Sequence, residues 1–199
     1  MPAQIKAFAD YEVLTAADVN AYLMNQSVIK VANTTERDSL STNVKVAYNT
    51  TTGDVYVRDG SNVWLTHHAS MQTYTPTWTA TSTDPTIGNG TRVGRWIQQG
   101  NLVTFTATIN MGSTTTYGSG LWSIGLPVAT ANITGFRQTF SAVLEDVSAG
   151  RHTGSAYSEP NSTSVTRIIA GAATSGVSNT SPFTWTNTDW ISVSGTYMV

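Results

Sequence analysis

The feature that most constrains the fold is a strict alternation of side-chain character between Leu102 and Ile109. One set of alternate positions is apolar, Val103, Phe105, Ala107 and Ile109, and the other set is mostly threonine. A period of two places the sets on opposite faces of a β-strand, with one face directed into a core. Just before it, Gly100-Asn101 has the composition of a tight hairpin turn that requires a positive φ. The segment predicts an antiparallel sheet and a mainly β fold.

Further strand-like segments follow, separated by turns rich in Gly, Pro, Asn and Ser, at residues 136–147, 151–158, 164–170 and 189–198. This spacing is typical of two packed sheets, so residues 76–199 are predicted to form an antiparallel, jelly-roll-like β-sandwich. Its predicted core is Val103, Phe105, Ile109, Trp122, Ile124, Leu126, Phe136, Phe140, Leu144, Ile168, Ile191, Val193 and Tyr197. Trp78, Trp96 and Trp185 are expected in this core or in a subunit interface.

Residues 1–68 are predicted to form a separate region with a short α-helix and a small β-meander. Thr15 and Asp18 form a capping-box-like start, so a helix is expected over residues 16–26. Its apolar stripe contains Tyr22 and Leu23, and a helix of this length is marginal alone, so these residues are expected at an oligomer interface. The meander at residues 43–66 is too small to be stable without partners. Residues 69–75 are expected to be a linker.

The composition argues against several classes of partner. Only 11% of the residues are charged, the formal net charge is −2, and there is no cysteine. Such a chain has no basic face for a phosphate backbone, so no nucleic-acid partner is expected. No apolar run approaches the roughly 20 residues of a membrane span, and the start lacks a signal-peptide pattern, so neither a membrane partner nor secretion by that route is expected.

No pattern in the sequence predicts catalysis. The carboxylates of the predicted sandwich are few, and nothing selects a glycosidase pair among Asp84, Glu145, Asp146, Glu159 and Asp189. Ser119 lacks the Gly-x-Ser-x-Gly signature around it. Adjacent His67 and His68 point to opposite sides of an extended chain, although a three-fold axis could bring repeated copies together around a metal. We therefore expect no enzyme activity, no cofactor and no metal.

Several segments together resemble the C-terminal β-sandwich of minor tail and fibre proteins from tailed phages that infect actinobacteria. They are Gly94-Arg95-Trp96, residues 114–120, Trp122 through Leu126-Pro127-Val128, residues 182–185, and residues 189–197. Residues 8–25, with Glu12-Val13-Leu14-Thr15 and the following residues to Asn20, resemble the N-terminal segment common in such phage structural proteins. The resemblance implies a virion protein, assembled in the host cytoplasm.

The resemblance also implies a homotrimer that binds other virion proteins through its N-terminal segment and displays the sandwich for host attachment. Aromatic rings stack on sugars, so host cell-wall carbohydrate is the expected ligand. Tyr117, in the polar loop at residues 112–120, is expected to be exposed and ligand-binding, with residues 161–163 on the same distal surface. The loop itself is expected to be mobile. Two alternatives stay open: a capsid decoration or head-fibre protein, and a polysaccharide-degrading tail spike.

Overall fold

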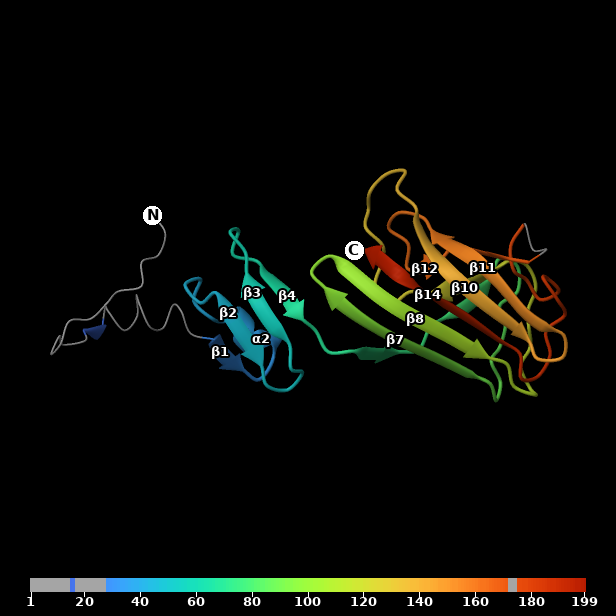
Figure 1. The fold of residues 1–199 in the computed structure, drawn as a ribbon, viewed down its shortest axis with the longest axis horizontal. Helices are drawn as coiled ribbons and strands as arrows, with labels where there is room; N and C mark the ends of the chain where they lie inside the picture. The colour runs from blue at the N-terminus through green and yellow to red at the C-terminus, as the bar shows by residue number, and fades with distance from the viewer. Residues whose placement is uncertain (1–14, 17–27, 172–174) are drawn as a thin grey trace. The chain divides into compact units, whose positions relative to one another are not determined.

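The structure is a computed structural model that describes residues 15–16, 28–171 and 175–199 (Figure 1). The chain divides into two compact units, Met1–Ser70 and Met71–Val199. Strands are the main regular structure of the described residues in both units, which confirms the predicted mainly β class. The expected helix at residues 16–26 lies outside the described residues except for Ala16, and so do Tyr22 and Leu23.

The first unit contains a four-stranded sheet in the order β1-β2-β3-β4. Its strands are β1 Val28–Val31, β2 Val46–Asn49, β3 Val55–Arg58 and β4 Trp64–His68. Strands β2 to β4 form an antiparallel meander, as predicted, and β1 adds to it in parallel to β2. In the described part of this unit, the buried apolar cluster consists of Val31, Ala47 and Tyr56. So small a core contributes little stability.

The sequence patterns above do not predict the short helix α2 Thr34–Asp38, which follows β1. Its N-cap is Asn33, whose side-chain oxygen accepts a hydrogen bond from the Glu36 amide at 2.9 Å. The Glu36 carboxylate in turn accepts from the Ala32 amide at 2.7 Å. The arrangement is a variant of the capping box, in which the N3 glutamate reaches the amide of the residue before the N-cap, and the Asn-x-x-Glu spacing could have identified the helix.

The connection between the units is shorter than the predicted linker at residues 69–75. Strand β4 reaches His68, and β5 Gln72–Tyr74 already belongs to the second unit. Thr73 and Tyr74 are strand-forming residues, and they pair with β7 instead of remaining free. Ser70 is held to the first unit, because its amide donates to the Asp54 carboxylate at 2.7 Å.

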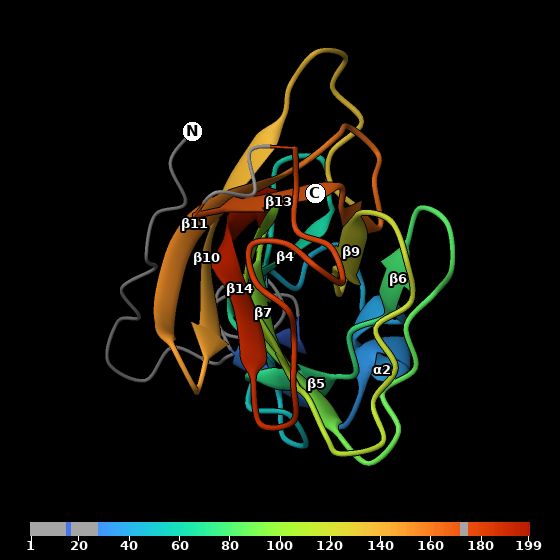
Figure 2. The ribbon, with the colours of Figure 1, turned by 90° about the vertical axis from the view of Figure 1, so that its right-hand side faces the viewer.

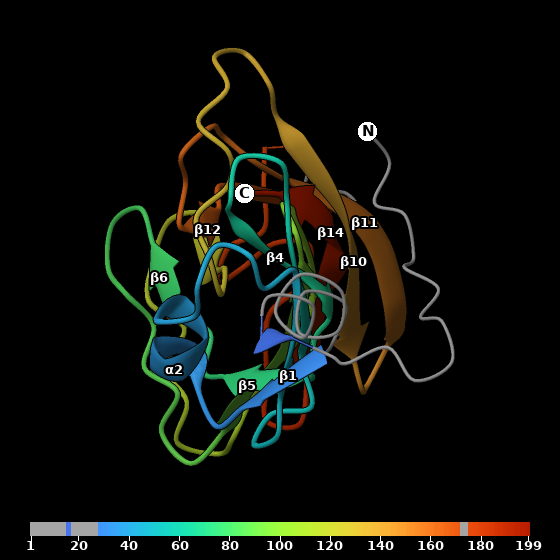
Figure 3. The same cartoon turned by 90° about the vertical axis from the view of Figure 1, so that its left-hand side faces the viewer.

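The second unit contains a seven-stranded antiparallel sheet in the order β13-β11-β10-β14-β8-β7-β5. The strands besides β5 are β7 Thr91–Gln99, β8 Leu102–Asn110, β10 Gln138–Asp146, β11 Gly150–Ser158, β13 Arg167–Ala170 and β14 Trp190–Met198. Figure 3 shows β11, β10 and β14 side by side. These three strands and β7 and β8 are each nine residues long, so they form a broad central surface.

The hairpin between β7 and β8 has the predicted turn. Gln99 lies opposite Leu102, and Gly100 has a φ of 60°. A glycine with positive φ at the first of two central positions is typical of a type II′ hairpin. Burial along β8 follows the predicted alternation, with Val103, Phe105, Ala107 and Ile109 buried and Leu102, Thr104 and Thr106 exposed.

A three-stranded sheet faces the larger one and completes the sandwich (Figure 2). It consists of β6 Trp78–Ala80, β9 Trp122–Gly125 and β12 Ser164–Val165. Trp122 and Ile124 from this sheet share one buried cluster with Phe105 and Leu144 from the large sheet. The second unit is therefore an antiparallel β-sandwich, and the jelly-roll subtype stays a prediction.

One predicted core residue, Phe136, is 42% exposed instead of buried. It belongs to the connection from β9 to β10, which projects from the sandwich (Figure 2). The Phe136 amide donates to the Ile133 carbonyl at 3.0 Å, and Gly135 has a φ of 77°. This β-turn keeps Phe136 out of β10, because the chain becomes extended only at Gln138.

Candidate functional site

Tyr117 is a packing residue rather than an exposed loop aromatic. Its ring is half-buried against the sandwich core, and burial raises the pKa of its hydroxyl, with a smaller contribution from the charge of Asp189. The indole N–H of Trp122 donates to the Tyr117 carbonyl at 3.2 Å. The expectation of an exposed ring is wrong, because the loop folds back onto the core.

The loop at residues 112–120 is anchored along much of its length, contrary to the expected mobility. Thr116 and Thr86 exchange two backbone hydrogen bonds of 2.8 and 2.9 Å. The Thr115 hydroxyl donates to the Ile87 carbonyl at 2.6 Å. Loops held by several such bonds open rarely, so this loop is a structural part of the sandwich.

The two loops expected on one distal surface lie at opposite ends of the sandwich. Residues 112–120 follow the end of β8. Residues 161–163 follow the end of β11, which lies opposite Gln138 at the start of β10. The Gln138 side-chain amide bonds to the backbone of Met198, and Met198 lies opposite the first residue of β8. The two loops therefore do not form one binding surface.

Two carboxylates of the sandwich have structural roles. Asp189 is fully buried, and it accepts hydrogen bonds from the Val147 amide at 3.0 Å and the Thr186 amide at 2.6 Å. Asp146 accepts from the hydroxyl and amide of Ser148 in the turn between β10 and β11. The Ser148 hydroxyl bond is the main cause that lowers the pKa of Asp146. Both groups fix turns at one end of the sheet.

The histidines lie in separate parts of the chain. His67 and His68 lie in β4 of the first unit, and His152 in β11 stacks on Phe183 with ring centroids 5.2 Å apart. Across residues 15–16, 28–171 and 175–199 there is no group of three or more His, Cys, Asp or Glu that could hold a metal ion. In the same ranges, no helix is long and apolar enough to cross a membrane.

Most tryptophans of the sandwich are core residues. Trp78 and Trp122 meet edge to face with centroids 4.8 Å apart, and Trp185 lies 4.8 Å from Trp122. Trp96 is partly buried against the same core. Trp190 differs, because its neighbour Ile191 is buried and alternation turns Trp190 to the other side of the sheet. Its half-exposed ring is a candidate for ligand contact.

We call the side of the seven-stranded sheet that points away from the core the outer face. Burial alternates along its central strands, and directly paired residues share a face. The outer positions on the central three strands are Thr139, Ser141, Val143 and Glu145 on β10, Arg151, Thr153, Ser155 and Tyr157 on β11, and Trp190, Ser192, Ser194 and Thr196 on β14. These residues are mostly hydroxylic, with two aromatic rings among them.

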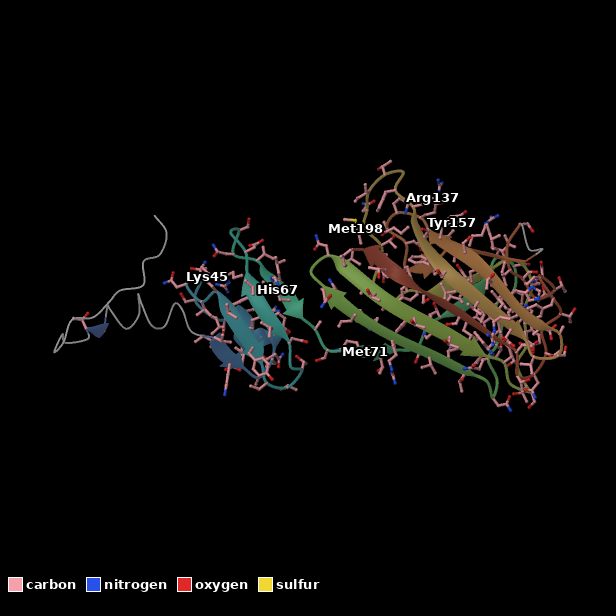
Figure 4. The ribbon with its side chains drawn as sticks, in the orientation of Figure 1. Lys45, His67, Met71, Arg137, Tyr157 and Met198 are labelled. Carbon is pink, nitrogen blue, oxygen red and sulfur yellow. The ribbon has the colours of Figure 1, made fainter. Side chains whose placement is uncertain are left out.

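At one end of the outer face lies the tyrosine cluster, formed by Tyr157, Arg137 and Glu159. The Arg137 guanidinium donates to the Glu159 carboxylate at 2.7 Å and lies 6.0 Å from the centre of the Tyr157 ring. The hydrogen bond to Glu159 raises the pKa of Arg137. Figure 4 shows Arg137 and Tyr157 close together at the edge of the sandwich. The cluster combines an aromatic ring with a neutralised ion pair.

At the other end lies the tryptophan cluster, formed by Trp190, Arg151 and Glu145. These residues occupy adjacent positions on β14, β11 and β10, with Glu145 paired to both neighbours. The Arg151 guanidinium donates to the Glu145 carboxylate at 2.5 Å and lies 5.9 Å from the Trp190 ring centre. The outer face therefore carries the same combination of groups at two places.

Small hydroxylic side chains lie between the two clusters. Ser155, Ser141 and Ser194 are directly paired across β11, β10 and β14. Ser192 lies one step along, and its hydroxyl is 3.0 Å from that of Thr108 on β8. The surface between the clusters is thus uncharged on these strands and free of bulky polar groups.

A shallow depression over β7 and β8, on the same sheet, is too small to be a ligand pocket. It has a volume of about 80 Å³ and is lined by residues of β7 and β8, with Met71 beside them. Pockets for small molecules are commonly about 300–1,000 Å³. The open surface over β10, β11 and β14 is the better candidate for recognition.

No protein-family model, no curated protein and no solved structure matches this chain.

The sequence patterns singled out Tyr117 and missed Tyr157 and Trp190. The missing information is the register of the hairpin between β10 and β11, which places Arg151 opposite Glu145 and Tyr157 opposite Thr139. The available signal was the parity of β11, since Arg151 and Tyr157 are six residues apart and an even spacing keeps strand residues on one side. The pairing of Trp190 with Glu145 joins segments 45 residues apart, and no local pattern predicts it.

Proposed function

We propose that this chain is a virion structural protein of the minor tail or fibre type, which forms a homotrimer and takes part in host attachment. The single observation that carries the proposal is the two-unit design. A β-sandwich with a broad outer face of hydroxylic and aromatic residues follows a separate unit whose described residues form a very small core. In this combination the sandwich suits a recognition domain displayed on the particle. The first unit suits an attachment segment that is stabilised by its partners.

The segments that resemble phage proteins support the same proposal through their placement. Gly94-Arg95-Trp96 lies on β7, Trp122 begins β9, and residues 192–197 lie within β14. All belong to the sandwich unit. In the proposed mechanism, three copies of a weak site held together on one particle gain a high effective concentration, so modest affinity at each site is sufficient for attachment.

Immunogold electron microscopy of purified particles, with an antibody raised against residues 71–199, tests the proposal. Gold particles are expected at the tail, and mass spectrometry of the same particles is expected to detect the chain. Labelling of the head would instead assign the chain to the capsid as a decoration or head fibre. Absence of the chain from purified particles would contradict a virion role altogether.

A further inference from the structure

We propose that the outer face binds a linear, uncharged polysaccharide that contacts the tyrosine cluster and the tryptophan cluster at the same time. The inference rests on the proposed function, because it assigns a surface and a ligand class to host attachment. It moves recognition from the loop that carries Tyr117 to the outer face of the large sheet.

The chemistry of each cluster suits a sugar ring. The apolar side of a pyranose packs on an aromatic face, and Tyr157 and Trp190 each present a half-exposed ring. Beside each ring lie an arginine and a glutamate that are hydrogen-bonded to each other. The arginine has further N–H donors and the glutamate has further acceptor positions that this bond does not use. Neighbouring hydroxyl groups of a sugar can bond to such a donor and acceptor together.

The charges of the two clusters favour an uncharged ligand. Each cluster contains one cation and one anion in contact, so neither has a net charge. Arg167, which lies opposite Tyr157, keeps its positive charge, and its guanidinium is held to the Ser175 carbonyl at 2.9 Å and belongs to neither cluster. A polyanion would find little net attraction at these clusters, and its repulsion by the two glutamates would offset its attraction to the arginines.

The distance between the clusters sets the length of the ligand. Tyr157 lies opposite Thr139 on β10, and Trp190 lies opposite Glu145, six residues further along the same strand. Six residues of strand span roughly 20 Å. One sugar ring is far shorter, so only an extended chain of several sugars reaches both rings. The small side chains of Ser141, Ser155 and Ser194 leave the path between the clusters clear.

Affinity electrophoresis of the full-length chain tests the inference. Gels would contain soluble arabinogalactan, galactomannan or mixed-linkage β-glucan as uncharged probes, and polygalacturonate as an anionic probe. The variants are Tyr157→Ala and Trp190→Ala, with Tyr48→Ala, a half-buried tyrosine of the first unit, as a matched control. We expect at least one uncharged polymer to retard the parent, each single variant to bind about tenfold more weakly, and the double variant not to bind.

A further variant keeps the test valid if Trp190→Ala unfolds. Ser141→Lys places a bulky charge on an exposed position between the clusters, and circular dichroism is expected to match the parent. This variant should also weaken polymer binding, while disaccharides should bind barely, if at all, to any form. Retardation at high salt should persist, because an uncharged ligand is not screened.

Four outcomes would overturn the inference. They are the absence of retardation by every uncharged polymer, equal binding by the parent and the folded cluster variants, retardation by polygalacturonate alone with loss at high salt, and a change of oligomer mass in the variants without a change in polymer binding. The third outcome assigns an anion site, and the fourth assigns a subunit interface. All are measured on purified protein, so they are independent of where the antibody labels the particle.

Discussion

The hydroxyl of Tyr197 joins the two ends of a long stretch of chain within the sandwich. It donates to the Val128 carbonyl at 2.8 Å and accepts from the Val128 amide at 3.3 Å. Tyr197→Phe leaves both backbone groups without this partner, so the free energy of unfolding should fall by about 1–2 kcal/mol. Denaturant unfolding at neutral pH measures the change. An unchanged midpoint would mean that water replaces the hydroxyl.

The same residue should make the fold sensitive to alkali. Burial raises the pKa of Tyr197 to about 12, whereas an exposed tyrosine ionises near 10. Its contribution to stability is therefore complete below pH 10 and is lost as the pH rises towards 12, where the unfolded chain releases the proton first. Tyr197→Phe should make this loss shallower in unfolding curves measured from pH 8 to 12. Burial also raises the pKa of Tyr74, so part of the loss should remain.

We expect the stability of the sandwich to require a carboxylate at position 189, so that a neutral amide of the same size does not replace it. Its two oxygens accept from the amides of Val147 and Thr186, and the Thr186 hydroxyl lies 3.1 Å away. Asp189→Asn replaces one acceptor by an N–H group that faces a donor, which should cost about 2–3 kcal/mol of stability. Thermal unfolding measures it. Asp38→Asn, at an exposed carboxylate that accepts from the Arg37 side chain, serves as the control for loss of charge, and an equal effect of the two changes would contradict the argument.

At the scale of elements, the pairing of the edge strand β5 with β7 requires a residue without a side chain at position 94. A Cβ at Gly94 would lie 2.1 Å from the ring of Tyr74, whereas a Cβ at Gly100 would meet nothing within 4 Å. Gly94→Ala should therefore displace Tyr74 and speed amide hydrogen exchange in residues 72–74. Gly100→Ala should cost about 1–2 kcal/mol through its positive φ alone, without selective exchange in β5. Equal exchange in β5 for both variants would argue against the steric explanation.

The sequence predicts best the strands that have one face in the core and the other face in solvent. Strand β8 alternates cleanly between core and solvent, so its faces follow from a period of two. Residues 164–170 form two strands instead of one, because β12 joins the small sheet and β13 the large one, and local composition does not record which sheet a residue joins. Phe136 is apolar and exposed, since a turn removes it from β10.

At the scale of the whole molecule, we expect a trimer. The described part of the first unit has a three-residue apolar core, so contacts with other copies should supply much of its stability. Light scattering of the full-length chain should give about three times 21.3 kDa over a range of concentrations. A mass that equals one chain at every concentration would contradict the trimer.

The two units should differ strongly in independent stability. A fragment of residues 71–199 contains the complete sandwich core and should unfold cooperatively. A fragment of residues 1–70 should lack a cooperative transition, because so small a core does not offset the loss of chain entropy. Calorimetry of the two fragments provides the comparison, and a sharp transition of the shorter one would show that it needs no partner.

The fold class follows from local patterns, but the candidate binding surface does not. The outer face forms where β10, β11 and β14 come together, and β14 is separated from the hairpin of β10 and β11 by about 30 residues. Composition favoured Tyr117 because its loop is polar and rich in glycine. The loop instead packs on the core, since Thr115 and Thr116 bond to the segment that contains Thr86 and Ile87.

The edge strands of the large sheet are shorter than its central strands. Strand β5 has three residues and β13 has four, whereas the five strands between them have nine each. A long unpaired edge strand can pair with an edge strand of a neighbouring molecule, and repeated pairing of this kind builds fibrils. Short edge strands have too few free backbone N–H and C=O groups for such pairing. Short edge strands therefore disfavour edge-to-edge growth even where several copies of the sandwich stand close together, as in the proposed trimer.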